Sequence, residues 1–159
     1  MKRMIASLLA TTAVFTATAA EPEWLTDTAK AQAQAKTENK LVLLDFTGSD
    51  WCGWCIKLNK EVFNTPEFAE YAKKNLVLVE VDFPRKKKLS AEQKSANEAL
   101  SKKYSIEGFP TLILLDGSGK KLGELSYSDG VEKSENVDRS KLVAKPATFI
   151  AAIEKKRKG

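Results

Sequence analysis

The chain of 159 residues contains no histidine and only two cysteines, Cys52 and Cys55. Two thiolates alone cannot complete the four-ligand shell of a structural zinc site. Attachment of a c-type haem requires histidine directly after the second cysteine of a Cys-X-X-Cys pair, and Ile56 occupies that position. These absences exclude both kinds of site, and we predict no metal and no cofactor. A two-coordinate copper(I) carrier stays open as an alternative.

The N-terminal apolar run, residues 4–15, is shorter than the roughly 20 residues that a membrane span requires. Lys2 and Arg3 precede it and small residues follow at 17–20, which is the pattern of an export signal peptide. We expect cleavage after Ala20 or one residue earlier, with an uncleaved anchor as the alternative. Residues 1–20 would then be a signal peptide, and residues 21–159 a domain in the periplasm or otherwise exported.

Basic residues gather in two clusters without interleaved aromatics, at 86–88 and 155–158. Cleavage of the signal removes two of the 26 basic residues and none of the 21 acidic ones, which leaves a net charge of 24 − 21 = +3. This mild charge, together with the expected places of the clusters in a loop and at the terminus, indicates solvated surface. We therefore predict that nucleic acid is not a partner.

The two cysteines belong to the segment Trp51-Cys52-Gly53-Trp54-Cys55, where a predicted strand gives way to a helix. A disulfide between residues three apart closes too small a loop to stabilise the fold much. The spacing instead puts a second thiol within reach of any mixed disulfide that the first thiol forms. The pair is interpreted as a two-electron carrier rather than as a structural crosslink.

Hydrophobic runs and helix caps predict one domain in which helices and strands alternate. Continuous apolar runs are typical of strands covered on both faces, and Ser90-Ala91-Glu92-Gln93 has the spacing of a capping box. The expected strands are 41–46, 76–81, 111–115 and 121–126, and the expected helices are 29–36, 52–60, 66–74, 91–104 and 147–156. This order predicts an α/β fold with a mixed central sheet and helices on both faces.

Two separated motifs resemble the thioredoxin superfamily, over about residues 40–127. The first is Leu44-Asp45-Phe46 followed by Trp51-Cys52-Gly53-Trp54-Cys55, and the second is Tyr104-Ser105-Ile106-Glu107-Gly108-Phe109-Pro110-Thr111. The first motif is further similar to exported bacterial disulfide reductases of the Dsb type. The resemblance implies a thioredoxin-like three-layer fold and a thiol-disulfide oxidoreductase that reduces protein disulfides.

Cys52 is the expected nucleophile, because backbone N–H groups at the start of the predicted helix favour a thiolate. Cys55 lies one turn further on and should resolve the mixed disulfide. The resemblance implies the same two roles.

The candidate substrate-binding residues are Trp51, Trp54, Phe109 and Pro110. Pro110 matches the family's cis-proline, which would bring the Phe109 backbone beside the disulfide to pair with an extended substrate. Trp51 has two interpretations, packing of the strand-helix junction or a substrate-facing surface. Trp54 stands where thioredoxin has proline, so a potential carried over from thioredoxin is in doubt.

Asp45 resembles the family's buried carboxylate, which accepts the proton of the resolving cysteine. The loop before Trp51 is one residue longer than in thioredoxin, so Asp50 is the fallback. Leu78 replaces the family's buried lysine, and without that cation Asp45 should hold its proton more tightly. Lys57 is expected to be solvated.

The direction of electron flow stays open between reductase, oxidase and isomerase. The reductase is favoured because the aromatic residues Trp51, Trp54 and Phe109 add no cation that would stabilise the Cys52 thiolate. Its expected partners are disulfide-containing proteins and a membrane-borne thiol electron donor. No dimerisation domain is visible, so a monomer is expected, and a non-catalytic binding module is a further alternative.

Overall fold

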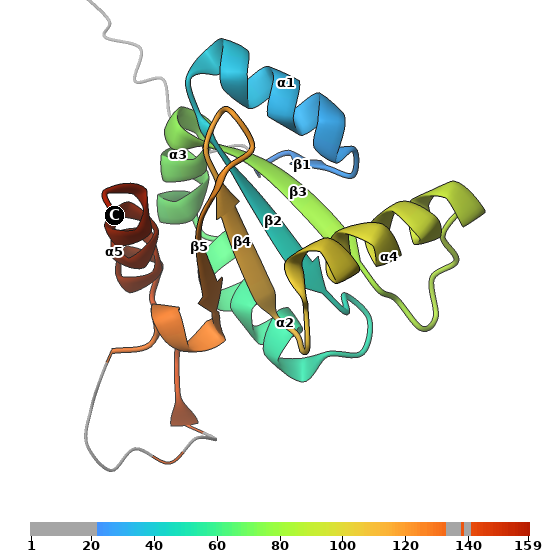
Figure 1. Cartoon of the computed structure of the whole chain (residues 1–159). Helices are drawn as coiled ribbons and strands as arrows, with labels where there is room; N and C mark the ends of the chain where they lie inside the picture. The colour runs from blue at the N-terminus through green and yellow to red at the C-terminus, as the bar shows by residue number, and fades with distance from the viewer. Residues whose placement is uncertain (1–21, 133–137, 139–140) are drawn as a thin grey trace, which may run out of the picture.

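The computed structural model describes residues 22–132, 138 and 141–159 (Figure 1). The predicted signal peptide therefore lies outside the described residues. Within them a five-stranded sheet has the order β1-β3-β2-β4-β5. Its strands are β1 (Trp24–Leu25), β2 (Leu41–Thr47), β3 (Leu76–Asp82), β4 (Thr111–Leu115) and β5 (Lys121–Ser126). β3 pairs in parallel with β1 and β2, whereas β4 is antiparallel to both β2 and β5, so the sheet is mixed as expected.

Helices cover both faces of this sheet, which gives the predicted three layers (Figure 1). Val42, Leu44 and Phe46 alternate with Leu43 along β2, and successive side chains of a strand point to opposite faces. The first set packs against α1 (Thr28–Glu38) and α4 (Ala91–Tyr104). Leu43 faces α2 (Gly53–Leu58), the π-helical turn η1 (Asn59–Phe63), α3 (Pro66–Asn75) and α5 (Pro146–Arg157).

Local capping explains where the helices begin. The Asp27 carboxylate accepts the Lys30 backbone N–H at the start of α1, and the Ser90 hydroxyl accepts that of Gln93 at 3.1 Å at the start of α4. The Gln93 side chain donates to the Thr26 carbonyl and the Asn97 amide oxygen. Because the Gln93 side chain makes these bonds, of the two bonds in the predicted capping box only the one to the Ser90 hydroxyl is present in this structure.

Two elements differ from the sequence prediction. The expected helix 52–60 is α2 followed by η1, where the Asn64 N–H donates to the Asn59 carbonyl five residues earlier. The wider turn lets the adjacent residues Val62 and Phe63 both enter the core. Strand β1 was not predicted, because two residues that pair only with Leu78 and Val79 leave no periodic pattern in the sequence.

An aromatic cluster joins the C-terminal helix α5 to the face of the sheet that Leu43 occupies. The Phe63 ring lies 5.0 Å from that of Phe68 and 5.8 Å from that of Phe149 on α5. Trp24 of β1 covers Phe63 at 5.1 Å. The packing of α5 therefore depends on Phe149, whose side chain is fully buried.

We expect Phe149→Ala to lower the free energy of unfolding by about 3–5 kcal/mol, because it removes a ring from a close-packed cluster. Urea unfolding followed by circular dichroism measures the change. Val143→Ala is the control, since Val143 is 54% exposed and should have an effect within about 0.5 kcal/mol. Equal effects of the two substitutions would contradict the packing described.

Candidate active site

The two cysteines lie where β2 leads into α2, and they form a disulfide with a Cα to Cα distance of 5.2 Å. Cys52 caps α2 in an extended conformation, and its Sγ accepts the Cys55 backbone N–H at 3.3 Å. Their exposed fractions, 7% and 4%, differ little in this oxidised form. What distinguishes the two thiols is position: the Cys52 sulfur accepts a backbone N–H at the helix start, which favours its thiolate after reduction.

Trp51 is built into the junction between β2 and α2. Its indole N–H donates to the Phe83 carbonyl at 2.8 Å. A Cβ on Gly48 would lie 2.5 Å from the indole, so this close approach requires glycine at position 48. The packing interpretation of Trp51 therefore holds, while the ring stays partly exposed.

The second motif meets the first at the same end of the sheet. The Phe109 ring lies edge-on to Trp51 at 6.0 Å and stacks on Phe83 at 5.2 Å. The peptide bond between Phe109 and Pro110 is cis, the isomer expected from the sequence. Pro110 precedes β4, whose first residue pairs with Phe46 of β2. The fold thus brings Phe109, with the adjoining Pro110, against Trp51, which directly precedes Cys52.

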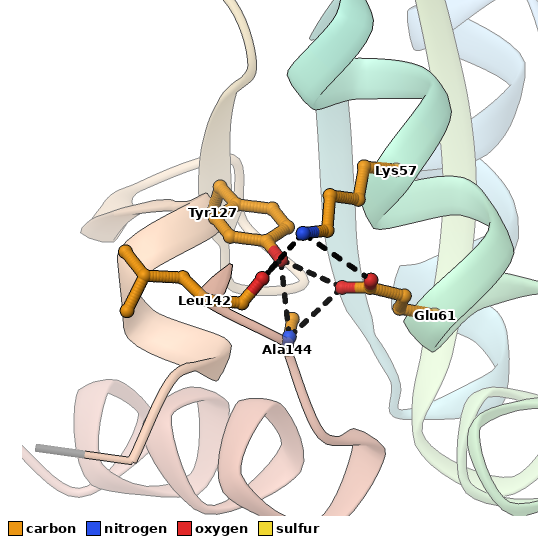
Figure 2. Close-up of polar contacts among 5 residues, drawn as sticks. All are labelled: Lys57, Glu61, Tyr127, Leu142 and Ala144. Carbon is orange, nitrogen blue, oxygen red and sulfur yellow. Dashed lines mark hydrogen bonds and ion pairs between the residues drawn. The ribbon is translucent and has the colours of Figure 1, made fainter. Parts of the chain in front are cut away.

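The expectation that Lys57 is solvated is wrong. Its ammonium donates to the Leu142 carbonyl and lies 3.7 Å from the Glu61 carboxylate (Figure 2). The same nitrogen lies 5.6 Å from the centroid of the Trp54 ring, which packs on Tyr127 at 4.9 Å and is 42% exposed. Lys57 is held by a segment 85 residues away, which local sequence patterns do not predict.

Figure 2 shows a polar cluster around Tyr127 that no local sequence pattern predicts. The Tyr127 hydroxyl donates to the Glu61 carboxylate at 2.6 Å, and the Ala144 N–H donates to the same carboxylate at 2.9 Å. Burial, followed by the hydrogen bond to Glu61, raises the pKa of Tyr127 well above its ordinary value. The cluster connects the 3-10 turn Tyr127–Gly130 and residues 142–144 to α2 and η1. We refer to α2, which begins directly after Cys52, as the redox helix.

Asp45 lies on the face of the sheet that α2 covers, because it alternates with Leu44 and Phe46 along β2. It is 8% exposed, and its Oδ1 has no hydrogen-bond partner among the described residues. Burial, then the charges of Glu80 and Asp82, raise the pKa of Asp45 to about 8. The buried Leu78 supplies no cation to oppose this, in the direction that the sequence predicted.

Asp50, the alternative candidate for the proton acceptor, binds backbone groups of the loop that follows β3. Its carboxylate accepts the backbone N–H groups of Arg85, Lys86 and Lys87 at 2.7–3.0 Å. These hydrogen bonds, that of Arg85 first, hold the pKa of Asp50 below its ordinary value. The geometry therefore separates the two acids: Asp50 anchors a loop, and Asp45 is buried on the face of the sheet that α2 covers.

The aromatic residues Trp51, Trp54 and Phe109 add no cation themselves, but the structure places one against Trp51. The Arg85 guanidinium lies 3.9 Å from the centroid of the Trp51 ring, directly before Cys52 in the chain. Arg85 comes from the connection between β3 and α4, more than 30 residues further along the sequence. Only the folding of that connection onto Trp51 brings the charge to the site.

Comparison with known proteins agrees with the fold and the cysteine pair. A family model described as a thioredoxin-like domain matches residues 28–135, and the chain belongs to this family. It is 40% identical over 102 residues to the disulfide bond reductase DsbH of Chlamydia pneumoniae, covering 64% of this chain and 61% of that protein. It is 31% identical over 144 residues to the thioredoxin-related protein DsbJ of the same organism, covering 87% and 41%.

A solved structure of a DsbH oxidoreductase superposes with a TM-score of 0.73 at 31% identity, covering 96% of this chain and 94% of that one. The chain thus spans less than two thirds of the length of the two curated relatives but nearly the whole of the solved structure. Among the described residues, no helix has the length and apolar character needed to cross a membrane.

Asp45 should make the folded protein less stable as the pH rises. Its pKa is about 8 when folded and 3.8 in the unfolded chain, so the folded state binds more protons between these values. The free energy of unfolding should therefore fall between about pH 4 and pH 8, by on the order of 5 kcal/mol for a single group. Asp45→Asn should flatten this slope in urea unfolding experiments across that range.

Asp50→Asn is the control for this experiment. The pKa of Asp50 is lowered, so its contribution to stability is lost as the pH falls, which is the opposite sign. The protein with Asp50→Asn should retain the decline toward high pH. An unchanged decline in the protein with Asp45→Asn would show that another group causes it.

Proposed function

We propose that this protein is an exported thiol-disulfide oxidoreductase that reduces protein disulfides with the Cys52 and Cys55 dithiol. The observation that carries the proposal is the position of Cys52 at the first turn of α2, with its Sγ facing the Cys55 N–H and bonded to the Cys55 sulfur. Membership of the thioredoxin-like family and the printed activity of the DsbH relative support it.

The reaction has two exchange steps. The Cys52 thiolate attacks one sulfur of the substrate disulfide, which breaks and releases a first thiolate while a mixed disulfide forms. The Cys55 thiolate then attacks the Cys52 sulfur and releases the second substrate thiolate. Two electrons pass to the substrate, whose two thiolates take up protons, and the protein is left with the Cys52–Cys55 disulfide.

Asp45 is suited to take the proton of Cys55 in the second step. Its pKa of about 8 lies close to the ordinary value of a thiol, about 8.5, and such matching favours proton transfer in either direction. Because its Oδ1 is buried without a hydrogen-bond partner among the described residues, the ionised form of Asp45 has an oxygen available to accept a proton. We assign it as the proton acceptor for the resolving thiol.

Trp51, Trp54, Phe109 and Pro110 form the proposed substrate-binding surface. Trp54 offers an exposed ring, and Phe109 precedes β4 at the end of the sheet where the disulfide lies. An extended substrate segment would pair with the Phe109 backbone. After each turnover the disulfide needs two electrons from outside. We propose a membrane-borne thiol donor in the compartment to which the predicted signal peptide would direct the protein.

Substitution of each cysteine tests the assigned roles. Cys55→Ser should accumulate mixed disulfides with protein substrates, because nothing remains to resolve the bond at Cys52. Cys52→Ser should accumulate none, since the attacking thiol is lost. Non-reducing electrophoresis with mass spectrometry detects the adducts, and the reverse pattern would exchange the two roles.

The reduction potential distinguishes a reductase from an oxidase. We expect a value below about −200 mV in a glutathione titration, nearer thioredoxin at about −270 mV than DsbA at about −120 mV. Arg85 against Trp51 is the observation that favours the opposite direction, because a nearby cation stabilises the thiolate. A potential close to that of DsbA would contradict the reductase and indicate an oxidase.

Catalysis by this protein of the reduction of insulin with dithiothreitol would exclude a non-catalytic binding module.

A further inference from the structure

Four consecutive cations lie in the connection between β3 and α4. Arg85, Lys86, Lys87 and Lys88 are all exposed, and we refer to these four residues as the basic loop. The sequence alone predicts that its lysines lie on solvated surface, and gives them no position relative to the site. The structure instead holds the basic loop against the site at two points.

The first point is Asp50, two residues before Cys52. Its carboxylate accepts the backbone N–H groups of Arg85, Lys86 and Lys87 at 2.9, 2.7 and 3.0 Å. Three hydrogen bonds to one carboxylate order the backbone of the loop. Because Asp50 binds amides, the side chains of the loop extend into solvent and stay available to a partner.

The second point is Trp51. Arg85 covers its ring at 3.9 Å, and the indole N–H on the same side chain donates to the Phe83 carbonyl at 2.8 Å. This cation–π contact holds the guanidinium over the ring. The beginning of the basic loop is thus fixed on the residue that directly precedes Cys52.

The charge of the basic loop is only partly compensated. Within the part of the chain that the structure describes, none of its four side chains forms an ion pair within 4.0 Å, although Asp50 attracts Lys86 and Glu80 attracts Lys87. On the other side of the disulfide, Lys57 beside Trp54 is paired with Glu61. Among the described residues, Arg85 on Trp51 is therefore the cation at the two tryptophans of the motif that has no ion pair, whereas Lys57 on Trp54 has one.

We propose that the basic loop selects disulfide substrates in which acidic residues flank the reacting cysteine. This inference rests on the proposed function. A substrate segment that pairs beside Phe109 would place its neighbouring side chains close to Trp51 and Arg85, because these three residues contact one another in series. Aspartate or glutamate in that segment would be attracted by several unpaired cations, which raises the association rate at low ionic strength.

The test compares two peptides that each carry one disulfide between a fluorophore and a quencher. In one the disulfide is flanked by aspartate and glutamate, and in the other by asparagine and glutamine. With the dithiothreitol-reduced mature protein at low salt, we expect the acidic peptide to react about tenfold faster. Because the attraction is screened, the ratio should approach one at about 0.5 M salt.

Neutralisation of the loop provides the decisive variant. Lys86→Gln, Lys87→Gln and Lys88→Gln together should bring the ratio of the two rates close to one at low salt, and leave the rate with the neutral peptide unchanged. An unchanged ratio in this variant would overturn the proposal.

A matched control removes the same charge elsewhere. Lys73→Gln, Lys155→Gln and Lys158→Gln lie on α3 and at the C-terminal end, are exposed, and should keep the preference for the acidic peptide. Loss of the preference in the control would show that net charge, and not the loop, is responsible, and would overturn the proposal.

The remaining outcomes separate this inference from the proposed function. If the native protein reduces both peptides at equal rates, the inference fails and the reductase stands. If it reduces neither, the proposed function fails and the inference fails with it. Loop-dependent binding to vesicles that contain phosphatidylglycerol, with no preference between the peptides, would assign the basic loop to a membrane surface and overturn the inference.

Discussion

The packing of α2 and η1 on the sheet is the constraint on which the site depends. Leu58, Val62 and Phe63 are buried in the core that Leu43 of β2 enters from the opposite side. Their burial fixes the axis of the redox helix and hence the place where it begins. Cys52 is consequently held at the first turn, with its sulfur facing the backbone N–H of Cys55. The chemistry at the helix start is a consequence of apolar packing further along the same helix.

The site includes an arrangement that lowers stability. Asp45 is buried on the sheet face that α2 covers, its Oδ1 has no partner among the described residues, and Glu80 lies beside it in the register of β3. A carboxyl group in such surroundings holds its proton to a higher pH, and its ionised form is costly to the fold. A group that exchanges a proton near neutral pH is what the resolving step of thiol exchange needs. Stability and proton transfer thus make opposite demands on one side chain.

Most elements could be predicted from the sequence because their signals are local. Ser90 caps α4 and Pro66 opens α3, and each helix begins where these residues indicate. The continuous apolar runs of β2 and β3 mark strands covered on both faces. The π-helical turn η1 and strand β1 escaped prediction, because the first is decided by how Val62 and Phe63 share the core and the second by pairing with β3.

The sequence by itself determined the cysteine pair, its place between a strand and a helix, and the acid at position 45, since spacing and local pattern are properties of the chain. Only the tertiary structure decided which charged side chains lie beside Trp51 and Trp54. Arg85 reaches Trp51 through a loop anchored on Asp50, and Lys57 is held by Glu61 and by Leu142. These contacts join segments up to 85 residues apart, and their energies depend on distance and burial, which do not exist until the chain has folded.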